Sequence, residues 1–238
     1  MVSHREVFRH NLFMITEQEL HFLLRTRETS LLLRVNEIGK LVCDHYGALI
    51  SESDIKSASF PNGMPPGRST IYDEKLCSSL ALSNITAEIS TPLKGDYLNP
   101  SLVLSSAKGQ VYDFVYVSHD IREPQKIEGL PTPRGAEEEL VIRLADKAME
   151  VEVELHYFVY EDCDVIGKNM VVINHGETSV ELIKAMSSQF CLIDNDYVLV
   201  ANFGNWAGEF SHCETPIGHF KYSFGSDTGS SGDYHNPF

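Results

Sequence analysis

Carboxylates are the most abundant groups in this sequence that could do chemistry. Two of them about 5 Å apart can cleave a glycosidic bond with retention of configuration, and a pair several ångström further apart can do so with inversion. The candidates are the run Glu137-Glu138-Glu139, the alternating Glu150, Glu152 and Glu154, and Asp194 and Asp196 around Asn195. We expect the first two sets to face water and the third to lie in a turn. None combines a raised-pKa acid with an ionised partner, so the residues alone give no complete catalytic constellation.

Motifs for metals, nucleotides and activated serines are also incomplete. His212, Cys213, His219 and His235 follow one another closely, but their spacing fits none of the usual zinc patterns. The chain contains no GxSxG elbow, no Walker loop and no GxGxxG after a strand. The stretch "GSDTGSSG" lacks the lysine and the helix of a phosphate-binding loop. We therefore expect no metal ion and no cofactor.

A binding motif surrounds the single tryptophan. In "NFGNWAGEF", Trp206 stands between glycines, and Glu209 follows three residues later. An indole flanked by glycine is open to approach, and its flat face can stack on the C–H face of a sugar while a carboxylate accepts hydroxyl protons. The alternative is a core tryptophan beneath a loop, because tryptophan is highly buried on average. The motif alone leaves both interpretations open.

Composition limits the partners. The 238 residues carry a formal net charge of −15, which repels phosphate backbones and anionic lipid, so nucleic-acid and membrane-surface roles are disfavoured. The first twenty residues lack the apolar core of a signal peptide, and no stretch is long enough to span a bilayer. We expect a cytoplasmic protein. The five cysteines are widely spaced without a CxxC, which indicates buried reduced thiols rather than a disulfide framework.

The elements that would position these residues are strands. In "MEVEVELHYFVY", Met149, Val151, Val153, Leu155, Tyr157 and Val159 alternate with acidic residues. This period of two predicts one buried and one wet face, and "ELVIRL" just upstream predicts a hairpin that turns at "ADKA". Further hairpins are expected over 169–187, turning at 174–177, and over 101–119, turning at Lys108-Gly109. Other expected strands are "HFLLRT", "SLLLRVNE", "DYVLVANF" and "HFKYSF".

Helix and loop signals are few. A modest helix signal lies in "YDEKLCSSLALS", residues 72–83. Residues 57–70 are rich in proline and glycine, and such a long loop is either a mobile surface excursion or functional. Residues 122–139 form a similar surface connection. Many short strands with glycine, asparagine and aspartate between them predict a β-sandwich.

Several fragments in a fixed order resemble the N-terminal β-domain of the α-galactosidases of glycoside hydrolase family 36. They are "RSTIYD", Glu88 followed by Asp96-Tyr97 and Pro100, "DFVYVSHDI", "GLP", "LVIRLAD", "YEDCDVI", "NHGE", "GNWAGE" and "GSSGDYHNPF". No fragment is specific by itself, but their shared order along most of the chain is. Three positions depart from the family pattern, because Leu98, Lys168 and Gly208 stand where the family has arginine.

The resemblance implies an all-β antiparallel β-supersandwich, incomplete at its C-terminal end. It implies that residues 1–238 are the N-terminal domain of a retaining α-galactosidase that acts on terminal α-galactosides such as melibiose and raffinose. Both catalytic aspartates would lie in a (β/α)₈ barrel absent from this chain, so the segment alone is expected to be inactive and to have unpaired strand edges.

The resemblance also implies two substrate contacts and a partner. Trp206 is expected to contact the galactoside, as is Asp54, although an ungapped alignment would place Lys56 at that position instead. Family members can complete the pocket from a neighbouring subunit, so the longer protein is expected to be a homo-oligomer. The alternative from another class is a non-catalytic carbohydrate-binding or structural β-sandwich module.

Overall fold

The structure, a computed structural model, describes residues 14–59, 71–76, 80–82, 85–93, 100–190, 196–204, 207–218 and 222. The chain divides into two compact units, Met1–Cys191 and Leu192–Phe238. Several sequence expectations fall outside the described residues, namely Trp206, Asp194, Cys77, Cys191, His219, His235, most of the loop 57–70 and, apart from Tyr222, the strand predicted over 219–224.

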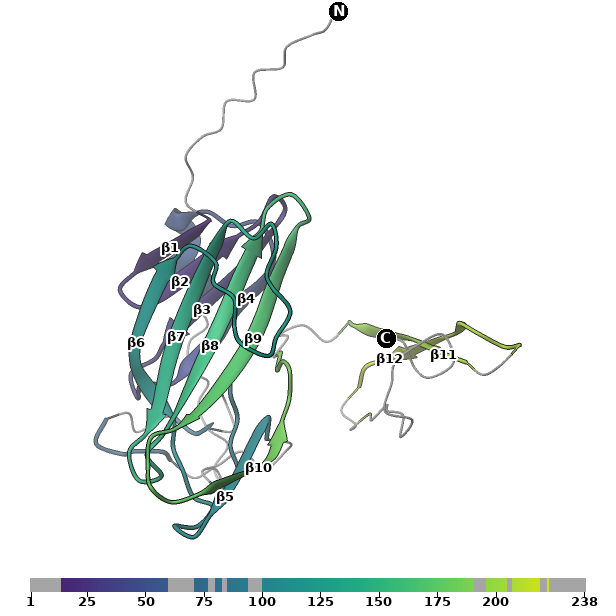
Figure 1. Cartoon of the computed structure of the whole chain (residues 1–238). Coiled ribbons are helices and arrows are strands. Elements are labelled where there is room, and N and C mark those ends of the chain that lie inside the picture. The colour runs from purple at the N-terminus through teal and green to yellow at the C-terminus, as the bar shows by residue number, and fades with distance from the viewer. Residues whose placement is uncertain are drawn as a thin grey trace, which may run out of the picture. The chain divides into compact units, whose positions relative to one another are not determined.

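Two four-stranded antiparallel sheets make up most of the first unit (Figure 1). The first sheet contains β1 (Ile15–Gln18), β2 (His21–Arg25), β3 (Thr29–Val35) and β4 (Leu41–Ala48). The second contains β6 (Val115–Arg122), β7 (Glu138–Asp146), β8 (Val151–Tyr160) and β9 (Val165–Asn174). In each sheet the strands lie side by side in chain order, so every connection joins neighbours.

The core lies between the two sheets. Each sheet turns the apolar half of its alternating residues inward, because successive side chains of a strand point to opposite faces. The inward residues include Phe22, Leu24, Leu31 and Leu33 from the first sheet and Leu140, Ile142, Val153 and Leu155 from the second. The predicted face from Met149 to Val159 is buried throughout. The all-β antiparallel sandwich is thus confirmed.

A short helical segment covers the outer face of the first sheet. The 3₁₀ turn η1 (Glu52–Asp54) leads directly into α1 (Ile55–Ala58). Ile55 is buried and packs in a second apolar cluster with Leu23 and Leu32, which point away from the main core. This packing fixes the segment that follows β4 on the sheet.

Two of the predicted hairpins are wrong. Both turns form, and Ser106 and Gly109 make a bridge at one of them. The strands that leave these turns nevertheless pair elsewhere, because β5 (Leu102–Ser106) pairs with β10 (Val180–Ala185) while β6 joins β7 and β9 joins β8. The short separation in sequence did not decide the partners, because β6 and β9 form longer ladders with β7 and β8 than β5 and β10 could offer them. The hairpin β7–β8 is confirmed. The strands expected from "HFLLRT" and "SLLLRVNE" form β2 and β3, which pair with each other.

The helix signal in residues 72–83 gave no α-helix in the part that is described. Residues 74–76 form a turn, and the Tyr72 amide donates a hydrogen bond to the Leu80 carbonyl. Leu80 and Ala81 are buried. A short serine-containing stretch nucleates a helix poorly, and here its apolar residues are buried by an irregular chain path instead.

The second unit contains one antiparallel pair among its described residues. β11 (Val198–Phe203) agrees with the strand predicted from "DYVLVANF", and it pairs with β12 (Ser211–Pro216), which the sequence analysis did not predict. η1 and α1 are three and four residues long, and no helix in the described part of the chain is long and apolar enough to cross a bilayer.

Candidate functional site

Asp54, the first predicted substrate contact in the described chain, ends η1. Its Oδ2 atom accepts the Ser51 hydroxyl at 2.6 Å and the Ser51 backbone amide at 2.9 Å. The hydrogen bond from the Ser51 hydroxyl has the largest effect and that from the Ser51 amide the next largest, and together they hold the pKa of the Asp54 carboxyl below its usual value. Asp54 is therefore an ionised, half-exposed carboxylate near neutral pH, able to accept hydrogen bonds from hydroxyl groups.

Neighbouring residues fix the position of Asp54. The Glu52 Oε1 atom accepts the Arg25 guanidinium at 3.1 Å and the Thr16 hydroxyl at 3.0 Å, so η1 is tied to β1 and β2. On the other side of Asp54, Ile55 is buried against the sheet. Lys56, the rival for the same role, lies two residues further on and is exposed. Asp54 and Lys56 thus both belong to the short helical segment on the outer face of the first sheet.

Trp206, the second predicted contact, lies outside the described residues. The strands that flank it in sequence pair with each other, and Phe203 is opposite Ser211. Glu209, which was expected to accept sugar hydroxyls beside the indole, is exposed, and its Oε1 accepts the Ala207 amide at 3.1 Å. One oxygen of the Glu209 carboxylate therefore accepts a hydrogen bond from the backbone two residues earlier in the chain.

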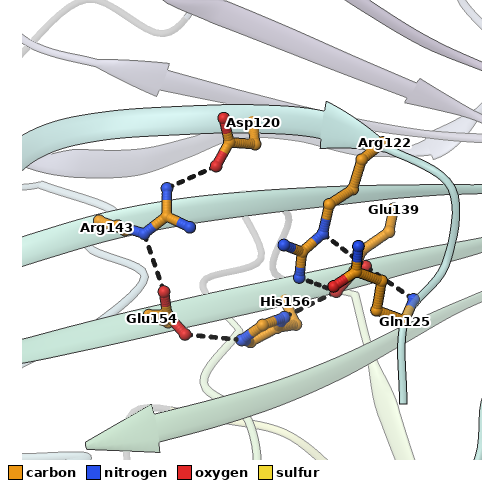
Figure 2. Close-up of polar contacts among 7 residues, drawn as sticks. All are labelled: Asp120, Arg122, Gln125, Glu139, Arg143, Glu154 and His156. Atoms are coloured by element: carbon orange, nitrogen blue, oxygen red, sulfur yellow. Dashed lines mark hydrogen bonds and ion pairs between the residues drawn. The ribbon is translucent and has the colours of Figure 1, made fainter. Parts of the chain in front are cut away.

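The interpretation of Glu137-Glu138-Glu139 as a solvated charge run is wrong for Glu139. Its side chain is fully buried, and it accepts Arg122 Nε at 3.0 Å, His156 Nδ1 at 2.7 Å and the Gln125 amide at 3.0 Å (Figure 2). Burial alone would raise the pKa of Glu139, but these hydrogen bonds outweigh it and lower the pKa. The connection 123–137 crosses in front of β8 and β9 (Figure 1), and its Gln125 amide contacts the buried Glu139 carboxylate.

The polar network continues along the outer face of the second sheet (Figure 2). His156 Nε2 lies 3.4 Å from Glu154 Oε2. The Arg143 guanidinium donates from Nε to Glu154 Oε1 at 2.8 Å and from Nη1 to Asp120 Oδ2 at 2.6 Å, so it links the two carboxylates. Arg143 is the main reason that the pKa of the Asp120 carboxyl is lowered. Carboxylates that are held ionised by several donors make poor general acids. The network therefore fixes β6, β7 and β8 to one another, and nothing in it resembles the acid and nucleophile of a hydrolase.

A second buried charge cluster joins the two sheets. Glu88 bonds through its amide to the Leu41 carbonyl of the first sheet. Its carboxylate accepts the Tyr157 hydroxyl at 2.7 Å and the Lys168 ammonium, both from the second sheet. Burial, followed by the Glu88 charge, raises the pKa of Tyr157 well above its ordinary value. Lys168 thus pairs with Glu88 at the junction of the two sheets, and its side chain is only 10% exposed.

Two cavities lined by described residues are small. One, of about 30 Å³, is lined by residues that include Lys40, Ile85 and Phe114. Another, of about 10 Å³, lies beside Glu88 and Lys168. A cavity needs about 10–15 Å³ of such space to hold one water molecule, so these two cavities have room for one to a few waters and not for a sugar ring.

The histidines and cysteines of the described chain form no metal centre. No group of three potential ligands is found there, and His212 contacts Glu214 at 2.9 Å. The prediction of buried thiols is right for Cys43 and wrong for Cys163, which is exposed, while Cys213 is intermediate; all three are free. Cys163 lies in the tight turn between β8 and β9, where no layer covers it.

Comparison with known proteins decides the family. The family model described as "Glycosyl hydrolase family 36 N-terminal domain" matches residues 39–238. The chain belongs to this family. Among solved structures, the galactosidase domain of the alpha-galactosidase-sucrose kinase AgaSK superimposes with a TM-score of 0.83 at 26% identity, over 94% of this chain and 32% of that one.

Curated relatives of this family 36 chain are much longer than it. The bifunctional alpha-galactosidase/sucrose kinase AgaSK of Mediterraneibacter gnavus is 28% identical over 221 residues, which cover 91% of this chain and 23% of that protein. Alpha-galactosidase Mel36A of Lactobacillus acidophilus is 27% identical over 234 residues, 96% of this chain and 32% of that protein. The chain therefore spans about a quarter to a third of the length of these relatives.

Proposed function

We propose that residues 1–238 are the N-terminal β-sandwich domain of a retaining α-galactosidase that hydrolyses terminal α-D-galactosyl residues of oligosaccharides of the melibiose and raffinose type. One observation carries the proposal. The chain matches the family 36 N-terminal model over residues 39–238 and is covered almost entirely by relatives named alpha-galactosidases. The catalytic aspartates belong to a (β/α)₈ barrel elsewhere in the longer protein, and the 238 residues alone are inactive.

Within that enzyme, Trp206 and Asp54 contact the galactoside. The ionised state of Asp54 and its fixed place on η1 support this role, since a carboxylate that accepts sugar hydroxyls must be charged and oriented. The small size of these two cavities, which are lined by described residues, agrees with a pocket that is completed by other parts of the enzyme.

The longer enzyme acts as a homo-oligomer in carbohydrate metabolism in the cytoplasm. The free thiols of Cys43, Cys163 and Cys213 support this location, because disulfides are rare in reducing compartments. Immunodetection in separated cell fractions tests it, and recovery from the extracellular fraction would contradict it.

The activity is tested with the longer protein and an aryl α-galactoside. We expect turnover by the longer protein and none by the 238-residue chain. Absence of turnover on this substrate and on related α-glycosides would remove the proposal. A module that only binds carbohydrate would instead bind galactosides as the isolated chain, in a calorimetric titration, without any turnover by the longer protein.

The two contacts are tested in the same assay. Trp206→Ala and Asp54→Asn are expected to raise KM about tenfold or more, the effect of losing one good contact with the substrate. Phe210→Ala is the control for Trp206→Ala, because Phe210 is exposed and lies in the same connection between β11 and β12. Asp162→Asn is the control for Asp54→Asn, because Asp162 is exposed and lies in the unrelated turn between β8 and β9. Equal effects of a contact variant and its control would contradict the assignment.

A further inference from the structure

Ser51 makes two hydrogen bonds to one oxygen of the Asp54 carboxylate. Its hydroxyl donates to Asp54 Oδ2 at 2.6 Å, and its backbone amide donates to the same atom at 2.9 Å. A carboxylate oxygen has two lone pairs, so these two donors occupy Oδ2. Among the residues that the structure describes, none donates to the other oxygen, Oδ1. The carboxylate is therefore held through one oxygen and can accept a further donor through the other.

The hydroxyl of Ser51 is itself fixed in direction. Ser53 Oγ lies 2.7 Å from Ser51 Oγ. Because the single hydroxyl hydrogen of Ser51 points to Asp54, the hydroxyl of Ser53 is the donor in this pair. The result is a short chain of hydrogen bonds that runs from Ser53 through Ser51 to the Asp54 carboxylate.

The backbone on both sides of the Ser51–Asp54 turn is anchored to the first sheet. Ahead of Ser51, the Ile50 amide donates at 3.0 Å to the hydroxyl of Ser30, a fully buried residue of β3. After Asp54, Ile55 is buried against the same sheet. The Asp54 amide also donates to the Ser51 carbonyl at 3.0 Å, which closes the turn. Ser51 therefore has a fixed place, from which its two donors set the direction of the carboxylate.

We propose that Ser51 is a positioning residue for galactoside binding, which holds Asp54 Oδ2 so that Oδ1 faces the substrate and accepts one of its hydroxyl groups. The inference rests on the proposed function, and within it on the contact assigned to Asp54. Without the Ser51 hydroxyl, rotation of the carboxylate is opposed by one of these hydrogen bonds instead of two. A less ordered carboxylate binds more weakly, because the cost of ordering it is then met when the substrate binds.

The test compares serine variants of the longer protein on an aryl α-galactoside. Ser51→Ala removes the hydroxyl and leaves the amide donor. We expect KM to rise about three- to tenfold with kcat nearly unchanged, the effect of losing one hydrogen bond that serves binding before and during the reaction. Ser51→Thr keeps a hydroxyl group and should restore KM.

Ser57→Ala is the matched control, because Ser57 is an exposed serine of α1 whose hydroxyl donates to the backbone carbonyl of Asp54 and not to its carboxylate. We expect it to leave KM unchanged. Circular dichroism confirms that each variant is folded.

The same change is then made in an Asp54→Ala background. A residue that acts through Asp54 has nothing left to position there, so Ser51→Ala should not raise KM further. A KM that Ser51→Ala leaves unchanged by itself, or raises as much with Asp54→Ala as without it, would overturn this inference and leave the proposed activity intact. So would a Ser51→Thr variant as impaired as Ser51→Ala, or an equal rise in KM for Ser57→Ala.

Two further outcomes separate this inference from the proposed function. A KM that Asp54→Ala leaves unchanged would overturn the inference, while turnover would still support an α-galactosidase. Absence of turnover by the unmodified longer protein would overturn both.

Discussion

Single residues in this domain take their roles from burial rather than from their type. Glu139 and Glu137 are two positions apart in one acidic run, yet Glu139 is sealed beneath the connection 123–137 and Glu137 is exposed. A buried carboxylate must be matched by donors, because an unpaired charge in the interior is strongly unfavourable. Arg122, His156 and the Gln125 amide supply them.

Glu139→Gln should destabilise the domain by about 3–5 kcal/mol, because it leaves the buried donors around it without their counter-charge. Urea unfolding followed by circular dichroism measures the loss. Glu137→Gln is the matched control, since Glu137 is exposed and only its contact with the Glu161 amide changes. Equal unfolding free energies for the two variants would contradict this account of Glu139.

The same variant should alter the response to acid. The pKa of Glu139 is lower in the folded chain than the unfolded value of about 4.3. Its ionisation therefore stabilises the fold above about pH 4.3, and this contribution is lost as the pH falls through the folded pKa. We expect the stability gap between the original chain and Glu139→Gln to narrow below about pH 4. A gap that stays constant down to acid unfolding would show that Glu139 is not the group responsible.

At the scale of elements, long-range contacts decide which strands become neighbours. β5 and β10 are far apart in sequence, yet they pair with each other rather than across the turns beside them. The cluster of Glu88, Tyr157 and Lys168 is another long-range contact, and it holds the two sheets together. It joins the segment beside β4 of the first sheet to β8 and β9 of the second.

Lys168 should be required for this junction. Lys168→Met leaves the Glu88 carboxylate buried without its cation, and we expect a loss of about 3–5 kcal/mol in the free energy of unfolding. Lys168→Arg, which retains the charge, should lose much less. The double variant Glu88→Gln with Lys168→Met should recover part of the loss, because it removes the unpaired charge. A double variant no more stable than Lys168→Met would contradict the pairing.

At the scale of the whole molecule, the two units differ in how much structure supports them. The first has two packed four-stranded sheets, whereas the described strands of the second are the single pair β11 and β12. An isolated two-stranded ribbon is marginally stable in water at best. Val198 and Val200 on β11 are about half exposed, so this ribbon buries little apolar surface.

The two units should therefore unfold separately. Trp206 is the only tryptophan and belongs to the second unit, so its fluorescence reports that unit, while far-ultraviolet circular dichroism is dominated by the sheets of the first. We expect the fluorescence transition at a lower urea concentration than the circular dichroism transition. Coincident transitions would show that the chain unfolds as one cooperative body.

The sequence by itself determined the fold class, several strands and the family. Alternation of apolar and charged residues sets which face of a strand is buried, and this information is local, as the face from Met149 to Val159 shows. The order of short motifs along the chain was enough to indicate the glycoside hydrolase family 36 domain. The roles of Asp54 and Trp206 were predictions from that resemblance and stay so.

Only the tertiary structure decided the pairing of β5 with β10 and the burial of Glu139. Each depends on contacts between segments that are distant in sequence. Local pattern cannot show that the connection 123–137 covers an acidic residue, nor which strand ends a sheet. Burial and strand order are settled by how the apolar faces pack together, because that packing supplies most of the favourable free energy of folding.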